Sequence, residues 1–183
     1  MSITCKAAIL YEEGKPHRIE NISIPSPGKG EVRLKMISAG VCASDAHYAW
    51  GNQILSEIPT HKIPIILGHE GAGIIESIGE DVNDVKVGDN VLVTVTPQCK
   101  QCKLCRSPDR TNNCLNMNAL TLGDYANKYF LDGTKICSFS GLGIFSEFVL
   151  LKREQIVKVY LKFFKKFLFI FLLFSHYSVF LSE

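Results

Sequence analysis

The chain has 183 residues, of which 46% are apolar and 21% are charged, as expected for one globular domain with or without a short appendage. The formal net charge of +2 gives no electrostatic reason to expect a nucleic-acid partner. The segment Met1–Leu10 lacks a basic stretch followed by an apolar core, so no secretory signal is indicated and we expect a cytoplasmic protein.

The N-terminal part predicts short β-strands that are separated by glycine and proline. Three segments fit this description: Ile3–Leu10, Arg18–Ile24 and Glu31–Ile37. The third alternates cleanly, with Val32, Leu34 and Met36 on one face. Short strands with glycine and proline turns are typical of a barrel or a sandwich, so we expect a mainly β fold with some α-helix.

Residue types that bind metals or transfer protons follow the third strand. Cys42, Asp45 and His47 lie within six residues of one another. Asp45 can alternatively be interpreted as the cap of a helix. The residues after His47, Tyr48–Lys62, are expected to form a loop.

A second candidate ligand pair, His69 and Glu70, follows an apolar run. Cys42 and His69 each follow a predicted strand, among small residues that would let a ligand approach. One thiolate and one imidazole form half of an open zinc site, with Glu70 and Asp45 as natural partners of the imidazole. By spacing alone, a cysteine and a histidine this far apart indicate a shared metal only weakly.

Further strands are expected at Ile74–Ile78, Asn90–Val95 and Phe145–Leu151, whereas Gly123–Thr134 is polar with one glycine turn. The pair Gly141 and Gly143 does not predict a dinucleotide-binding fingerprint, because the third glycine is missing and a strand is expected after it.

Four cysteines lie close together: Cys99, Cys102, Cys105 and Cys114. Four thiolates in one short run are the ligands of a closed tetrahedral zinc site, which is usually structural. We expect this run on a loop, because neither a helix nor a strand would point all four inward. The alternative is two disulfides in a secreted protein. Cys5 and Cys137 have no partner at a useful spacing and are expected to be buried or free thiols.

The composition changes from Tyr160 onward. The uninterrupted apolar run Phe167–Phe174 is shorter than the roughly 17–25 residues of a membrane-spanning helix. Three interpretations remain for the tail: a poorly ordered or non-native segment, a membrane anchor, and a buried helix or strand. A membrane partner is therefore not the favoured interpretation.

Four motifs stand together in one order: Gly40–His47, Gly68–Gly79, Val87–Val91 and the four-cysteine run. In this arrangement the chain resembles the N-terminal catalytic domain of zinc-dependent medium-chain alcohol dehydrogenases of the animal type. The resemblance implies a GroES-like barrel domain over residues 1–159, with a structural-zinc lobe at about 97–116. Residues 160–183 then form a divergent apolar tail.

The resemblance also implies roles for individual residues. Cys42 and His69 match two ligands of the family's catalytic zinc, and Glu70 matches a carboxylate that is sometimes an alternate ligand. Ser44 matches the hydroxyl that takes the proton of the alcohol, and His47 matches the imidazole that passes it to solvent. The structural zinc ligands are matched by Cys99, Cys102, Cys105 and Cys114. The family oxidises small-molecule alcohols, here primary or lipophilic ones such as retinol, to aldehydes with NAD.

The chain departs from the family pattern in two respects. No cysteine follows Val159, so the third cysteine ligand of the catalytic zinc is not found. No glycine fingerprint of a coenzyme-binding Rossmann domain is found either. We therefore expect a truncated family member. The family forms a homodimer, which we do not expect of this chain. The competing hypotheses are a non-catalytic zinc-binding fragment and a membrane-attached protein.

Overall fold

The computed structural model describes residues 1–51, 63–109, 112–121, 128–160 and 178–180. These residues form mainly strands with a few short helices. The strands are β1 (Ile3–Leu10), β2 (Arg18–Ile24), β3 (Glu31–Gly40), β4 (Ile65–Ile66), β5 (Glu70–Ile78), β6 (Asn90–Val93), β7 (Tyr129–Leu131), β8 (Thr134–Ser138), β9 (Phe148–Lys152), β10 (Ile156–Lys158) and β11 (Ser178–Phe180). The helices are α1 (Ala43–Ala49), α3 (Met117–Thr121) and the 3-10 turns Phe139–Gly141 and Arg153–Gln155.

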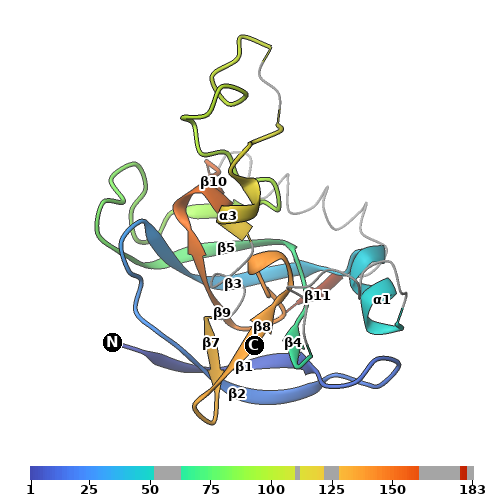
Figure 1. Ribbon diagram of the computed structural model, residues 1–183. Coiled ribbons are helices and arrows are strands. Elements are labelled where there is room, and N and C mark those ends of the chain that lie inside the picture. The colour runs from blue at the N-terminus through green and yellow to red at the C-terminus, as the bar shows by residue number, and fades with distance from the viewer. Residues whose placement is uncertain (52–62, 110–111, 122–127, 161–177, 181–183) are drawn as a thin grey trace.

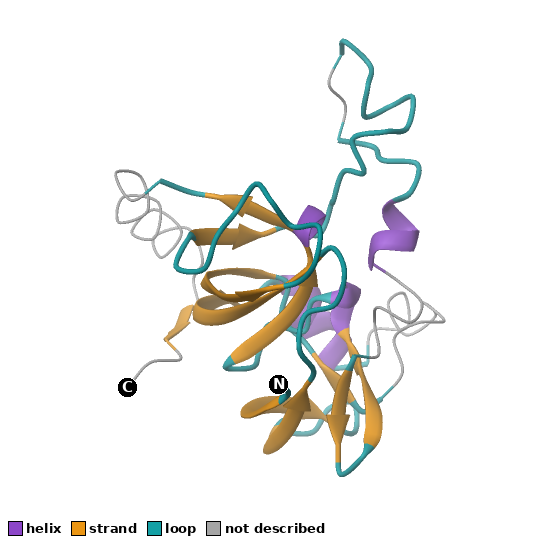
Figure 2. Cartoon of the chain, turned by 90° about the vertical axis from the view of Figure 1, so that its left-hand side faces the viewer, coloured by secondary structure: helices purple, strands orange, loops and turns teal. Residues whose placement is uncertain are grey.

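The strands form two sheets. A closed barrel contains β1, β2, β7, β8 and β4, and a six-stranded sheet has the order β10-β6-β5-β3-β11, with β9 also paired to β3. Figures 1 and 2 show the two sheets side by side, with α1 at the far end of β3. The mainly β barrel fold predicted from the sequence is confirmed.

The first two predicted strands have the observed bounds, and the third continues to Gly40. Val32, Leu34 and Met36 are buried as expected. Arg33 is buried as well, and its guanidinium bonds the carboxylate of Glu76 with a shortest distance of 2.7 Å. The side chain of Arg33 therefore enters the protein with its charge paired.

Other boundaries differ from the sequence predictions. The residues after Cys42 form helix α1, so the expected loop begins only after this helix, and residues 52–62 of it lie outside the described part of the chain. The polar segment Gly123–Thr134 contains strand β7, which turns through Asp132 and Gly133 into β8. Short strands such as β7 and β10 carry too few residues to establish a period, so their sequences predict little.

Each sheet has its own apolar core. One cluster gathers around β3, β5 and β9 and includes Leu34, Ile75 and Leu151. The other lies inside the barrel and includes Ile9 and Ile22. Fully burying such a side chain stabilises the fold by roughly 1.5–3 kcal/mol.

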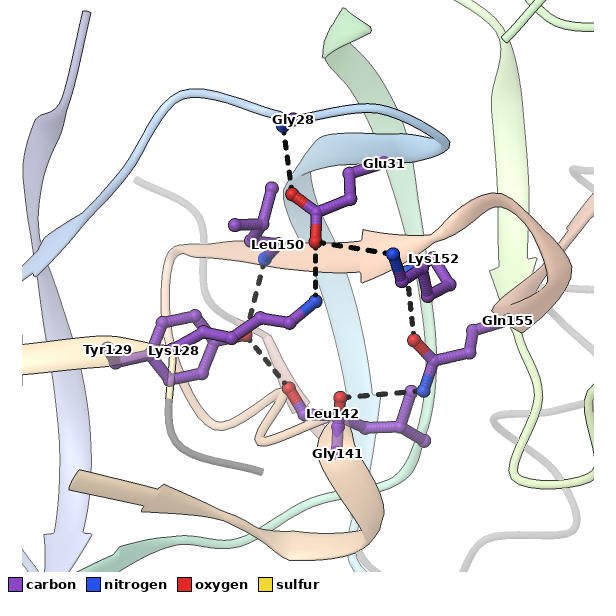
Figure 3. Close-up of polar contacts among 9 residues, drawn as sticks. All are labelled: Gly28, Glu31, Lys128, Tyr129, Gly141, Leu142, Leu150, Lys152 and Gln155. Atoms are coloured by element: carbon purple, nitrogen blue, oxygen red, sulfur yellow. Dashed lines mark hydrogen bonds and ion pairs between the residues drawn. The ribbon is translucent and has the colours of Figure 1, made fainter. Parts of the chain in front are cut away.

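A polar network joins the two sheets (Figure 3). The hydroxyl of Tyr129 on β7 donates to the carbonyl of Leu142 at 3.0 Å and accepts the backbone N–H of Leu150 on β9 at 3.2 Å. Beside it, the carboxylate of Glu31 on β3 accepts the Lys128 ammonium at 3.0 Å. Because buried polar groups are costly unless they are hydrogen-bonded, these contacts fix how the barrel meets the second sheet.

Most of the tail lies outside the described residues, and so do the predictions of a poorly ordered tail or a membrane anchor over residues 161–177. Ser178–Phe180 form β11, which pairs antiparallel with Ser38–Gly40. Within the described ranges, no helix combines the length and the apolar composition that crossing a membrane requires.

The coenzyme domain of the family is likewise not seen in the part of the chain that the structure describes, which contains no parallel βαβ unit. Gly141 is the last residue of a 3-10 turn, and Gly143 follows this turn. The next element is strand β9, so a strand follows the two glycines, as predicted. Both glycines have positive φ, and a Cβ on Gly141 would lie 2.5 Å from the carbonyl of Thr121. Their role is backbone conformation and close packing.

Candidate metal centres

The four cysteines of the run lie on a loop that projects from one end of the molecule (Figure 1, yellow-green). The Sγ atoms of Cys99, Cys102, Cys105 and Cys114 all lie within 4.8 Å of one another. Zinc–sulfur bonds of about 2.3 Å at tetrahedral angles place sulfur atoms about 3.8 Å apart. The spacing of this cluster therefore fits a tetrahedral metal ion.

The backbone N–H groups of the loop lower the pKa of the Cys99 and Cys102 thiols, whereas burial and a hydrogen bond with Cys102 raise the pKa of the Cys105 thiol. Sulfur atoms of the cluster accept N–H groups at 3.3–3.4 Å from the backbone of Cys99, Cys102, Cys105 and Asn116. The N–H groups of Cys105 and Leu115 lower the pKa of the Cys102 thiol to about 6. Since the thiolate is the form that binds metals, the loop suits a closed metal site.

All seven cysteines are free thiols. The two-disulfide alternative for the cysteine run is therefore not what the structure contains. Cys5 and Cys137 are buried, as expected, and burial raises the pKa of Cys5 to about 11. A thiol with such a pKa is inert near neutral pH.

A second group of potential ligands combines Cys42, His69 and Glu70, whose ligand atoms also lie within 4.8 Å of one another. Cys42 lies at the start of α1, whereas His69 and Glu70 lie at the start of β5. The backbone pairing of β3 with β5 places Gly40 opposite Glu70. The two segments are thus brought together by the sheet, as the resemblance implied.

Asp45 connects the two segments. Its Oδ2 accepts the N–H of Cys42 at 3.0 Å, and its Oδ1 accepts the N–H of Gly68 at 2.9 Å and lies 3.2 Å from Nδ1 of His69. The side chain of Asp45 is 2% exposed. The contact with Nδ1 agrees with the imidazole-partner interpretation. The helix-cap interpretation is wrong in its detail, because Cys42 is the cap residue of α1 and Asp45, at the third helical position, bonds back to the N–H of Cys42.

The contact with Asp45 orients the imidazole of His69. Burial lowers the pKa of His69, but the hydrogen bond and charge of Asp45, with a further contribution from Cys42, outweigh this effect and raise it to about 9. With Nδ1 turned to Asp45, Nε2 faces Ser44 Oγ at 3.2 Å and Glu70 Oε1 at 3.9 Å. Nε2 is therefore the atom that is available to a metal.

The small residues near His69 are required by the packing around them. Gly68 has φ +90°, and a Cβ there would lie 2.5 Å from the ring of Phe145; a Cβ on Gly71 would lie 2.6 Å from Ile144. These glycines are required for close packing against Phe145 and Ile144, and their role in the access of a ligand stays a prediction.

One aromatic contact of the site was not predicted from the sequence. The buried ring of Phe139 lies 5.2 Å, centroid to centroid, from the imidazole of His69 and 5.7 Å from the ring of Tyr48. Phe139 follows β8, whose parallel pairing with β4 brings it here. Nothing local in its sequence indicates this contact.

The two predicted proton-transfer residues lie on α1. Ser44 is partly buried and contacts His69, whereas His47 is exposed on the same helix. His17 is half-buried, and its Nε2 is enclosed by the protein without a hydrogen-bond partner among the described residues. His61 and His176 lie outside the described residues.

Comparison with known proteins identifies the family. The alcohol dehydrogenase GroES-like domain matches residues 28–160. The chain belongs to this family. The chain is 43% identical over 159 residues to a geraniol dehydrogenase from Carpoglyphus lactis, covering 86% of this chain and 42% of that protein. It is 38% identical over 162 residues to an alcohol dehydrogenase class-3 from Zea mays, covering 86% of this chain and 41% of that protein.

Solved structures agree with this assignment. A zinc-binding alcohol dehydrogenase domain protein from Burkholderia ambifaria has a TM-score of 0.75 at 26% identity, covering 88% of this chain and 43% of that one. A benzyl alcohol dehydrogenase from Acinetobacter calcoaceticus has a TM-score of 0.68 at 25% identity, covering 87% of this chain and 42% of that one. The GroES-like chain thus spans about two fifths of the length of the curated relatives it matches.

Proposed function

We propose that this chain supplies the zinc-binding and proton-transfer part of an oxidoreductase that oxidises primary or lipophilic alcohols with NAD. The observation that carries the proposal is the group formed by Cys42, His69 and Glu70, with the hydroxyl of Ser44 3.2 Å from the imidazole. Membership of the alcohol dehydrogenase family supports the reaction class.

The proposed catalytic zinc ligands are Cys42, His69 and Glu70. Three protein ligands with one open position are the composition of catalytic zinc sites. Glu70 would take the place of the third cysteine, for which the described residues offer no candidate near this group. Asp45 would hold the imidazole in the orientation that ligation needs, and partners of this kind typically change metal affinity 10–100-fold.

When bound, zinc would act as a Lewis acid that lowers the pKa of a coordinated hydroxyl group. The protein residues then have to remove one proton. Ser44 would accept it from the alcohol while donating its own proton onward. His47 lies three residues later on the same helix, where side chains at i and i+3 are neighbours, and its exposure would let the proton reach solvent. Histidine is a side chain that commonly transfers protons in enzymes.

The four-cysteine loop would hold a second, structural zinc. Its ligands are all protein thiolates, so no position is open for a substrate. We propose residues 1–159 as the GroES-like domain, about 97–116 as its zinc lobe and 160–183 as a divergent tail. Four metal-binding thiols require reducing conditions, which supports a cytoplasmic location.

The coenzyme and the substrate rest on the family. Relatives are named for geraniol and for alcohols in general, which supports a small-molecule alcohol or aldehyde; retinol is one lipophilic candidate. NAD as hydride acceptor is proposed by the same resemblance, and no described residue is assigned to bind it. The family's homodimer is not proposed for this chain.

The test combines metal analysis with an activity assay on the purified chain. Two zinc ions per chain are expected, falling to one in Cys42→Ala and to one in Cys102→Ala. NADH formation that depends on added alcohol should disappear in Cys42→Ala. Activity that persists in Cys42→Ala would contradict the proposed ligand set.

A non-catalytic zinc-binding module is the second candidate function. The observation that favours it is that the four-cysteine cluster is complete within residues 99–114. It predicts one zinc per chain and no NADH formation with any alcohol. Finding two zinc ions together with alcohol-dependent NADH formation would rule it out.

A further inference from the structure

Strand β3 changes its neighbour along one edge. β9 pairs with Glu31–Lys35, and the N–H of Met36 donates to the carbonyl of Glu147 at 2.9 Å. Just before β9 in the sequence, the chain lies beside β1 instead of β3, and Ser146 forms an isolated β-bridge with Ala7. The rest of the edge, Ser38–Gly40, is paired with β11 from the end of the chain.

A pocket of about 460 Å³ opens where β9 leaves β3. Its wall is largely apolar and includes Ala39, Val41 and Phe145. Ala39 is also the partner of Val179 in the pairing with β11. β11 therefore adjoins a place where the protein's own side chains leave space beside an edge of the sheet.

The edge itself is poorly suited to stand alone. Ser38, Ala39 and Gly40 have small side chains or none, and glycine weakens a strand because it loses more conformational freedom than other residues. A bare edge also presents N–H and C=O groups that another strand can pair with. A strand on this edge both satisfies these groups and orders the backbone.

The position of the edge gives this ordering a consequence. Gly40 is paired with Ser178 on one side and with Glu70 on the other. Two residues later comes Cys42, whose thiol lies in the same ligand group as Glu70. The backbone at Gly40 thus controls the separation of two proposed ligands, and metal sites require their ligands to be held within about 0.5 Å.

We propose that β11 is a latch strand: its docking on Ser38–Gly40 positions Cys42 and Glu70 for the metal, and this rests on the proposed function. Recognition is through main-chain hydrogen bonds, as in β-strand addition. The occupant is the Ser178–Phe180 segment of the same chain. Figure 1 shows β11 beside β3 near α1.

The experiment removes the latch without touching the site. Successive N–H groups of a strand point to opposite sides, so one of Val179→Pro and Phe180→Pro removes an N–H that faces β3. Deletion of residues 178–183 removes the strand altogether. Val179→Ala and Phe180→Ala are the matched controls, because they keep the backbone N–H groups.

Two measurements are made on every variant. Amide hydrogen exchange in the metal-free chain reports the protection of Ala39 and Gly40. Competition with a chromophoric chelator reports the two zinc affinities separately. Ala39 and Gly40 are successive, so the N–H of one faces β11 and the N–H of the other faces β5. Deletion and at least one proline variant should lose the protection of the N–H that faces β11, while the N–H that faces β5 stays protected. The same variants should weaken the second zinc about tenfold, while the four-cysteine zinc and the alanine controls keep the wild-type affinity.

Several outcomes would overturn the latch. Unchanged protection and unchanged affinity after deletion would do so while leaving the proposed function intact. Protection that rises with protein concentration would assign the strand to a second copy and overturn the intrachain form. If the unaltered chain binds only one zinc ion, the proposed function fails, and the role of the latch in metal binding fails with it. Retained protection of both Ala39 and Gly40 in the deletion variant would separately overturn the docking of β11.

Discussion

The four-cysteine loop and the Cys42–His69 site use similar ligands but depend on different amounts of the chain. The loop draws its four ligands from residues 99–114, and the N–H groups that bond their sulfurs come from the same stretch and from the adjacent Leu115 and Asn116. The second site draws ligands from the start of α1 and the start of β5, and these meet only because β3 pairs with β5. One site is local and the other is assembled by the fold.

This difference has an energetic consequence. Among its described residues, the loop contributes none to the apolar clusters of the two sheets, so we expect its stability to depend on the proposed zinc. The assembled site instead relies on Asp45 and on the sheets around it. Damage to the fold should therefore reach the second site first and leave the loop unaffected.

The largest effect is expected from Cys102→Ser. It should remove most of a metal-binding free energy on the order of 10 kcal/mol, because a closed site with three thiolates binds zinc far more weakly. Zinc content should fall by one, and proteases should cut within residues 99–114, while the barrel keeps its unfolding midpoint. Lys103→Ala, an exposed position of the same loop, is the control. Loss of the whole fold in Cys102→Ser would show that the loop is not independent.

Asp45→Ala should have the next largest effect, on the assembled site alone. It leaves the N–H groups of Cys42 and Gly68 without their acceptor in a buried position. We expect a loss of about 3 kcal/mol in the free energy of unfolding and loss of the zinc bound at Cys42 and His69, measured by denaturant titration and metal analysis. Asp45→Asn keeps one acceptor oxygen and should be intermediate. A simultaneous loss of the loop zinc would break the distinction between the two sites.

The same distinction explains what could be predicted from the sequence. The four cysteines and the strands β1 and β2 are encoded by local spacing and alternation, and both were found. Cys42 and His69 were weak candidates by spacing and became strong ones only through the family resemblance, because the contact between them is made by strand pairing. Phe139 on the imidazole had no local signal, since the parallel pairing of β4 with β8 brings it there.

Tyr129→Phe tests the connection between the barrel and the second sheet. The buried hydroxyl makes two hydrogen bonds, to Leu142 and from Leu150, that phenylalanine cannot replace. The expected loss in the free energy of unfolding is about 2 kcal/mol, with both zinc ions retained, because neither partner lies in a metal site. Urea denaturation monitored by far-UV circular dichroism gives this free energy of unfolding. An effect below the measurement error would mean that water replaces the hydroxyl.

The smallest effect is expected from Glu31→Gln, and it depends on pH. Burial raises the pKa of Glu31, but the Gly28 N–H and the Lys128 ammonium outweigh burial and hold the pKa below its usual value. A carboxylate with a lowered folded pKa stabilises the fold above the unfolded pKa of about 4.3, and this stabilisation is lost as the pH falls through the folded pKa.

The variant should therefore be less stable than wild type by about 1 kcal/mol near neutral pH, because glutamine can still accept the Gly28 N–H. The two unfolding free energies should converge as the pH falls through the folded pKa of Glu31, as measured by urea titration from neutral to acidic pH. A constant difference at every pH would mean that the charge of Glu31 contributes nothing.

Because Glu31 begins β3, the strand that leads to Cys42, a weakened second zinc in this variant would also show that strain passes along β3. An unaltered loop zinc in the same sample would keep the local site separate from the assembled one.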